Sequence, residues 1–186
     1  FTEQLQLLVN NPTKGMHRYM PNAGYLETRQ AIAQELKGET GLPYDSSNVL
    51  MTVGAGGAIN VALHAILNPG DEVIIFTPFF AEYLFYVANH NAKSVVVGCD
   101  AEFTPDLTEL ESKITERTKV VMVNSPNNPS GKVYNQSFTY RLAEVLARKS
   151  NQFGTEIYLL SDEPYRKIIF DDLQYPFPQL AYERTI

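Results

Sequence analysis

Short apolar runs alternate with longer segments of mixed polarity along most of the chain. The runs are rich in β-branched residues, and they are NVLMTV (48–53), EVIIFT (72–77), SVVVG (94–98), KVVMVN (119–124) and IYLLSD (157–162). Because both faces of each run are apolar, the pattern is typical of strands in a parallel sheet that helices cover on each side.

The segments between these runs have helical patterns. We expect helices over 25–40, 56–67, 80–90, a segment that begins near Thr104, and 136–149. Thr104 can cap its helix, with Pro105 at the first helical position, where the missing N–H costs nothing. The alternation predicts an α/β fold with a mostly parallel sheet flanked by helices.

Composition narrows the class of protein. The 186 residues are 44% hydrophobic and 19% charged, with a net charge of −6 and 15 scattered Lys and Arg residues. This balance argues against a nucleic-acid surface, and no apolar run reaches the length of a membrane span. Cys99 is the single cysteine, so it cannot form an internal disulfide, and we interpret it as a small apolar filler. We expect a cytoplasmic protein without a metal site.

Both ends of the sequence suggest a truncated domain. Phe1 is not an initiator Met, and at Ile186 the chain stops at what we interpret as the start of another apolar segment. We therefore expect a fragment of a longer protein, with an N-terminal segment and helix over 1–44 and a sheet-forming region over 45–186.

The candidate chemistry lies directly after the apolar runs. Those segments are GAGGA (54–58), PFFAEY (78–83), NSPNNPSG (124–131) and DEPY (162–165). In a parallel α/β sheet, ligands bind outside the carboxyl ends of the strands, so these segments should converge.

Each segment also has a purely structural interpretation. The small residues 54–57 could present helix N–H groups to a phosphate, or simply form a tight turn. Phe79 and Phe80 could stack on a flat ring or fill the core. Asp162 could bind a ligand or cap a helix, and its burial is costly without a cationic partner. Tyr165 could donate a hydrogen bond into the same site or pack.

Taken together and in this order, the segments resemble the coenzyme domain of pyridoxal-phosphate-dependent aminotransferases of fold type I, class I/II. NNPSG matches the N-P-[ST]-G turn of that family, and SDEPY matches its D-x-x-Y motif. The segment YMPNAGYLETRQAIAQEL also resembles a family pattern, with Thr28 where Leu is usual. The resemblance extends from about Tyr19 to Asp171 and implies pyridoxal 5'-phosphate as cofactor.

The resemblance also implies roles for single residues around the pyridine ring of the cofactor. Asp162 would keep the ring nitrogen protonated, because a nearby carboxylate favours the cation. Asn128 and Tyr165 would hydrogen-bond the ring oxygen, and Phe80 would stack on the ring. The turn around a cis Asn128–Pro129 bond would then be a rigid mount for Asn128.

At the phosphate, the resemblance implies contacts from two subunits. Ala55 and Gly56 would offer backbone N–H groups, and Tyr19 would reach the phosphate of a neighbouring subunit. A homodimer with shared sites follows from that role.

The resemblance places the Schiff-base lysine of the family beyond Ile186, after a strand that should begin at ERTI. We therefore expect no catalytic residue within the chain. Lys167 lies in the wrong place for that motif, and we interpret it as a solvated lysine. The small domain is also expected to be absent, and we predict that the isolated chain is inactive. The parent protein would transfer an amino group between an amino acid and a 2-oxo acid.

Three alternatives remain open from the sequence. A lyase, synthase or racemase of the same fold would share these residues. A transcription regulator could use an aminotransferase-like domain to sense the cofactor. An α/β nucleotide or sugar-phosphate enzyme is the third, although the chain has neither G-x-G-x-x-G nor G-x-x-x-x-G-K-[ST] at its first turn.

Overall fold

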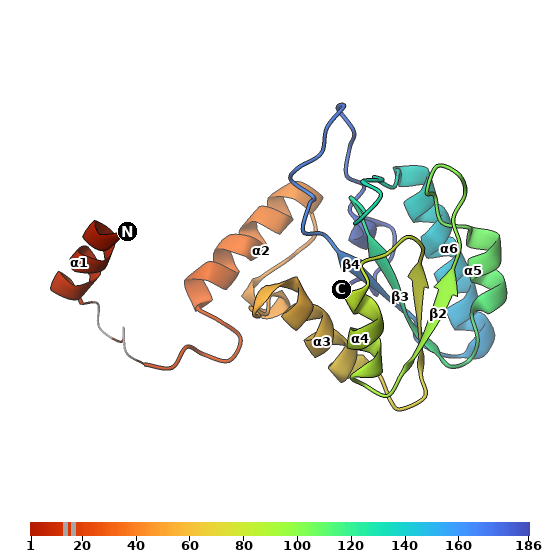
Figure 1. Cartoon of the computed structure of the whole chain (residues 1–186), viewed down its shortest axis with the longest axis horizontal. Helices are drawn as coiled ribbons and strands as arrows, with labels where there is room; N and C mark the ends of the chain where they lie inside the picture. Colours follow the sequence, from red (N-terminus) through yellow and green to blue (C-terminus); the bar gives the residue numbers. More distant parts are fainter. Residues whose placement is uncertain (13–14, 16–17) are drawn as a thin grey trace. The chain divides into compact units, whose positions relative to one another are not determined.

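The computed structural model describes residues 1–12, 15 and 18–186. They form two compact units, Phe1–Met51 and Thr52–Ile186. The sequence pattern placed this division between 44 and 45. The first unit contains α1 (Thr2–Asn10), α2 (Leu26–Thr40) and the 3-10 turn η1 (Ser46–Asn48), shown in red and orange in Figure 1.

The first unit is held together around the start of α2. The Arg29 Nη1 donates to the Ser46 carbonyl at 2.8 Å, and the Met51 N–H donates to the Ala23 carbonyl at 3.0 Å. Gly24 has a φ of +97°, and a Cβ there would lie 2.3 Å from the Met51 Cγ. Only glycine therefore fits where the two segments meet.

A four-stranded parallel sheet forms the centre of the second unit. Its strands are β1 (Glu72–Phe76), β2 (Lys93–Val97), β3 (Thr118–Asn124) and β4 (Tyr158–Asp162), in the order β2-β1-β3-β4. The chain returns beside β4 at its end, where Leu159 pairs in parallel with Thr185 and the Ser161 N–H donates to the Ile186 carbonyl at 2.8 Å. This pairing agrees with the strand expected at ERTI.

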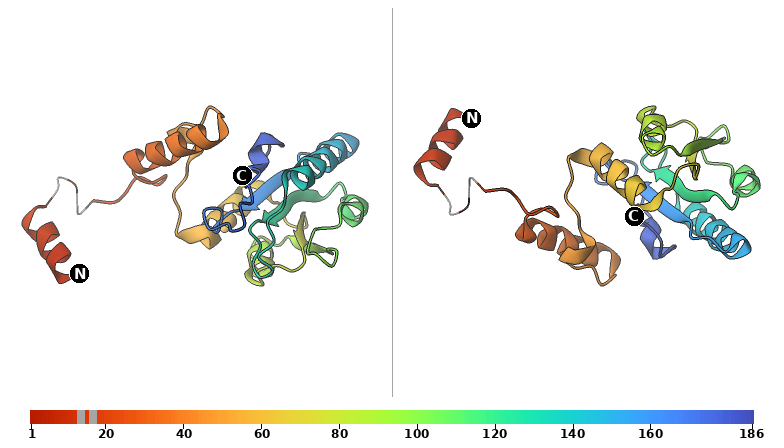
Figure 2. Two further views of the ribbon diagram at one scale, coloured as in Figure 1. Left: turned by 90° about the horizontal axis from the view of Figure 1, so that it is seen from above. Right: turned by 90° about the horizontal axis from the view of Figure 1, so that it is seen from below.

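Helices cover both faces of the sheet, as the views in Figures 1 and 2 show. They are α3 (Gly54–Ile66), α4 (Glu82–Ala88), α5 (Leu107–Lys113) and α6 (Gln136–Phe153), followed by the 3-10 turn η2 (Pro178–Leu180). Successive strand residues point to opposite faces. In β1, Val73 and Ile75 pack with α3 and α4, whereas Ile74 and Phe76 pack with α5 and α6.

The fold class predicted from the sequence is confirmed by this three-layer arrangement. Four of the five predicted strands form, within one or two residues of their expected bounds. No helix in the described part of the chain is long and apolar enough to cross a membrane.

Two local predictions were wrong. Residues 48–53 form no strand: they have no strand partner, and Leu50 and Val53 are 54% and 96% exposed. Thr104 caps no helix, because α5 begins later and the Asp106 carboxylate accepts from the Thr108 and Glu109 N–H groups at 2.8 and 3.1 Å. Pro105 instead forms a β-bridge with Cys99.

Candidate functional site

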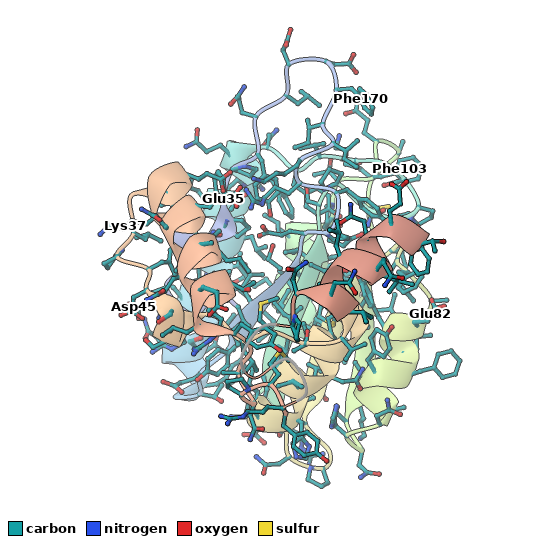
Figure 3. The ribbon with its side chains drawn as sticks, turned by 90° about the vertical axis from the view of Figure 1, so that its left-hand side faces the viewer. Glu35, Lys37, Asp45, Glu82, Phe103 and Phe170 are labelled. Carbon is teal, nitrogen blue, oxygen red and sulfur yellow. The ribbon has the colours of Figure 1, made fainter. Side chains whose placement is uncertain are left out.

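The candidate site lies where β1, β3 and β4 end. The chain continues from these strands into 77–83, 125–132 and 163–165, and α3 begins beside the same part of the sheet. Figure 3 labels Glu82 at the start of α4, and Phe170 in the loop that follows β4. The predicted ligand-binding segments thus follow three strand ends and one helix start, because residues 48–53 do not form a strand.

Asp162 is the last residue of β4 and is partly buried. Its Oδ2 accepts a hydrogen bond from the Tyr83 hydroxyl. Burial raises the pKa of the Asp162 carboxyl above its ordinary value, and the hydrogen bond from Tyr83 opposes that rise. The sequence suggested a cationic partner or a helix cap, whereas the structure provides a neutral phenol and no helix begins at Asp162.

Tyr83 is a functional candidate that the sequence analysis did not identify. Its ring is only 2% exposed and packs in the apolar cluster between the sheet and helices α3 and α4. Burial, and then the bond to Asp162, raise the pKa of the Tyr83 hydroxyl far above its ordinary value, so the phenol keeps its proton. A buried tyrosine needs an acceptor, and Asp162 was the carboxylate in need of a partner. The need of each group for a partner is the feature of the sequence that could have indicated the pair.

The turn after β3 is braced by two asparagines. The Asn124 Nδ2 donates to the Asp162 carbonyl at 2.9 Å, and its Oδ1 accepts from the Asn128 N–H at 2.6 Å. Asn127 is 6% exposed and donates to the Pro78 carbonyl at 3.1 Å. Its Oδ1 accepts from the Ser130 N–H at 3.1 Å and from the Ser130 hydroxyl at 2.7 Å. The polar character of the turn is therefore explained by its own hydrogen bonds.

Asn128 and Tyr165 have side chains that this network does not use. The Asn128–Pro129 bond is cis, as anticipated, and the Asn128 side-chain amide forms no hydrogen bond with any described residue. Tyr165 is 39% exposed, and it lies close enough to Tyr83 to contribute to the raised pKa of that phenol. Both side chains thus have polar groups free to bind a ligand.

Phe80 lies just before α4, in a loop and not within the expected helix 80–90. Its ring meets the Tyr83 ring edge-on, with centroids 5.8 Å apart and an interplanar angle of 81°. It packs partly buried against the cluster between the sheet and helices α3 and α4. Phe80 is therefore connected to Asp162 through Tyr83.

The start of α3 supplies backbone donors. Gly54 enters the helix with a φ of 68°, and no side chain caps this end. Ala55 lines a cavity of about 100 Å³ together with Asp162. A Cβ at Gly56 would lie 2.8 Å from the Tyr86 hydroxyl, so a larger residue fits there only if Tyr86 shifts. Uncapped N–H groups and the helix dipole favour an anion at such an end.

Tyr19 and Lys167 are both exposed to solvent. Tyr19 belongs to the first unit and its side chain is fully exposed. Lys167 is an exposed residue beyond Tyr165. Among the residues that the structure describes, no group of three or more His, Cys, Asp or Glu side chains is arranged to hold a metal ion.

Comparison with known proteins gives a consistent result. The family described as aminotransferase class I and II matches residues 3–183. The chain is 36% identical over 176 residues to an aspartate aminotransferase from Pyrococcus horikoshii, which covers 93% of the chain and 44% of that protein. It is 35% identical over 175 residues to an aspartate/prephenate aminotransferase from Thermus thermophilus, with the same coverage of both proteins.

Solved structures agree. An amino transferase from Eubacterium rectale superimposes with a TM-score of 0.93 at 35% identity, over 99% of this chain and 47% of that one. The aspartate aminotransferase from Thermus thermophilus with maleate gives 0.85 at 33% identity, over 99% and 46%. The chain therefore spans less than half the length of these relatives. With a family match across nearly all of its residues, the chain belongs to the aminotransferase class I and II family.

Proposed function

We propose that this chain is part of the cofactor-binding domain of an enzyme that transfers an amino group between an amino acid and a 2-oxo acid. The observation that carries the proposal is the Asp162 carboxylate. It lies at the carboxyl end of a parallel strand, with one oxygen bound by Tyr83 and the other without a hydrogen bond from any described residue. A partly buried carboxylate with a free oxygen is suited to a cationic ligand atom.

The family depends on pyridoxal phosphate, and the residues of the site fit that group. A protonated pyridine nitrogen requires a carboxylate, which Asp162 offers. The phenolic ring oxygen requires neutral donors, which the unused Asn128 amide and the Tyr165 hydroxyl offer. When bound, the cofactor supplies an electron sink for carbanion chemistry at the substrate α-carbon. By favouring the protonated ring, Asp162 would make that sink stronger.

The phosphate fits the start of α3. Ala55 and Gly56 stand in the first turn, where N–H groups have no partner within the helix. Backbone donors and the helix dipole together favour a phosphate at this helix end. Phe80 would lie against the ring, and its edge contact with Tyr83 would restrain it.

The names of the relatives favour amino-group transfer over the alternatives. Both sequence relatives are called aspartate or aspartate/prephenate aminotransferases. A lyase, a synthase or a cofactor-sensing regulator has no comparable support. We extend the proposal to a homodimer in which Tyr19 reaches the neighbouring phosphate, and to a cytoplasmic location without nucleic-acid or membrane partners.

An absorbance titration with pyridoxal phosphate tests the proposal. We expect the full-length protein to bind the cofactor and to exchange amino groups when given an amino acid and a 2-oxo acid. The 186-residue chain should show no turnover, because the family's lysine is expected beyond Ile186. Asp162→Asn is the matched variant and should lower both affinity and rate. Full-length protein that ignores pyridoxal phosphate would contradict the proposal.

A further inference from the structure

We propose that Tyr83 is a positioning residue, whose phenol holds the Asp162 carboxylate in the orientation and the ionised state in which it binds the pyridine nitrogen of the cofactor. The inference rests on the proposed function for its ligand. Its geometry, however, is a property of this chain alone, and it can be tested without the cofactor.

Packing fixes the position of the Tyr83 ring. Its ring lies in the cluster that also contains Ile75 and Met122, between the sheet and helices α3 and α4. The ring contacts Phe80 on one side and Tyr86, 6.4 Å away between centroids, on another. A ring that is 2% exposed and packed in this way cannot turn its hydroxyl to another acceptor without disturbing the core.

The Asp162 carboxylate is held at one of its two oxygens. The Tyr83 hydroxyl engages Oδ2 only, and the Asn124 side chain anchors the backbone carbonyl of the same residue at 2.9 Å. Two contacts from different elements therefore fix Asp162 at its backbone and at its carboxylate. Oδ1 is left for a ligand, since no described residue donates to it.

The Tyr83 hydroxyl also affects the charge of Asp162. Partial burial favours the neutral acid and raises the pKa of Asp162, and the Tyr83 hydrogen bond is the contact that lowers it. The groups that act on Tyr83 are Asp162, Tyr165 and Tyr86, and together with burial they keep its proton in place. Tyr83 is thus a donor over the whole working range of pH, and its bond favours the carboxylate form. A lysine or arginine in its place would also stabilise the carboxylate but would compete with a cationic ring for it.

The test begins with ligand-free protein labelled with carboxyl-¹³C aspartate, in which Asp162→Asn identifies the Asp162 signal. We expect the Asp162 carboxyl of Tyr83→Phe to titrate at a higher pH than in the wild type. Tyr140→Phe, which removes an exposed phenol from α6, should leave the titration unchanged. An unchanged Asp162 titration in Tyr83→Phe would overturn the proposal.

A double-mutant cycle on affinity for pyridoxal phosphate separates positioning from a merely structural role. Tyr83→Phe should weaken binding by about 10-fold in the wild-type background, the order expected for a hydrogen bond to a charged group. In the Asp162→Asn background the same change should have less than about a 2-fold effect, because no carboxylate remains to be positioned. Equal losses in both backgrounds would overturn the proposal.

Two further outcomes remain informative. If Tyr83→Phe does not fold, replacing Tyr83 by difluorotyrosine keeps the ring and makes the phenol a stronger donor. The Asp162 carboxyl should then titrate at a lower pH than in the wild type, and a shift in the other direction would overturn the proposal. If the full-length protein binds no pyridoxal phosphate, the proposed function fails, while the ligand-free titration still decides whether Tyr83 controls Asp162.

Discussion

The turn at 124–132 and the start of α3 at 53–57 lie at the same site but are built in opposite ways. In the turn, Asn124 and Asn127 satisfy the backbone with their own side chains. At the start of α3 no side chain caps the helix, Val53 is 96% exposed, and the residues that follow are small. The turn is complete without a ligand, whereas the helix start has donors that only a ligand or water can satisfy.

This difference separates stability from binding. Substitutions in the braced turn should act mainly on folding, and substitutions at the open helix start mainly on affinity. Asn128 is the instructive exception, because it sits within the braced turn but its side chain takes no part in the bracing.

The largest expected effect comes from Asn127→Ala. The change removes three side-chain hydrogen bonds and leaves the Pro78 carbonyl and the Ser130 donors without this partner in a buried turn. We expect the free energy of unfolding to fall by about 2–4 kcal/mol. Urea denaturation followed by circular dichroism measures it. A loss no larger than that of Asn128→Ala would show that the turn does not depend on this side chain.

The next largest effect concerns the helix start. Ala55→Pro removes one N–H from the first turn of α3, where no intrahelical bond is lost. Affinity for pyridoxal phosphate should fall by about 10-fold or more, as expected for one hydrogen bond to a charged group. Absorbance titration measures the affinity.

Ala55→Gly is the control for that variant, since it keeps the N–H and alters the same position. It should bind the cofactor nearly as well as the wild type. If Ala55→Pro also binds normally, the phosphate is not held by this helix end.

A smaller effect is expected at Asn128. Asn128→Ala removes a side chain that no described residue uses, so the free energy of unfolding should change by less than about 0.5 kcal/mol. Affinity for pyridoxal phosphate should fall by about 5-fold, the value of one neutral hydrogen bond. Calorimetric titration beside the denaturation series measures both. Strong destabilisation with normal affinity would reverse the roles assigned to Asn127 and Asn128.

The same two regions show what the sequence could and could not predict. Asn128 was identified because its position in NNPSG carries the family resemblance. The bracing by Asn127 was not, because its partner Pro78 lies 49 residues away and no local pattern links them. The role of Tyr83 was not predicted for the same reason, since 79 residues separate it from Asp162.

The incorrect predictions have a related cause. The run 48–53 has the composition of a strand, but a strand forms only where a neighbour offers a ladder of hydrogen bonds, and here the Met51 N–H bonds to Ala23. Thr104 and Asp106 are both residue types that cap helices well. Pro105, between them, forms a β-bridge with Cys99, and the helix begins after Asp106. The layered sheet was predictable because its apolar runs are unbroken, rich in β-branched residues and regularly separated by helical segments.

The smallest effect depends on pH and concerns Asp162, which both regions border. Burial raises the pKa of Asp162 in the folded protein above its ordinary value of 3.8. At pH values between the ordinary pKa and the raised pKa, the folded state therefore binds more protons than the unfolded state. The contribution of Asp162 to stability must then fall as pH rises through that window and level off above it. Thermal unfolding of the wild type and of Asp162→Asn from pH 3.5 upward isolates this contribution. Their difference in unfolding free energy should move against the wild type as the pH rises. A change in the opposite direction would mean that Tyr83 outweighs burial and that the carboxylate is stabilised in the folded protein.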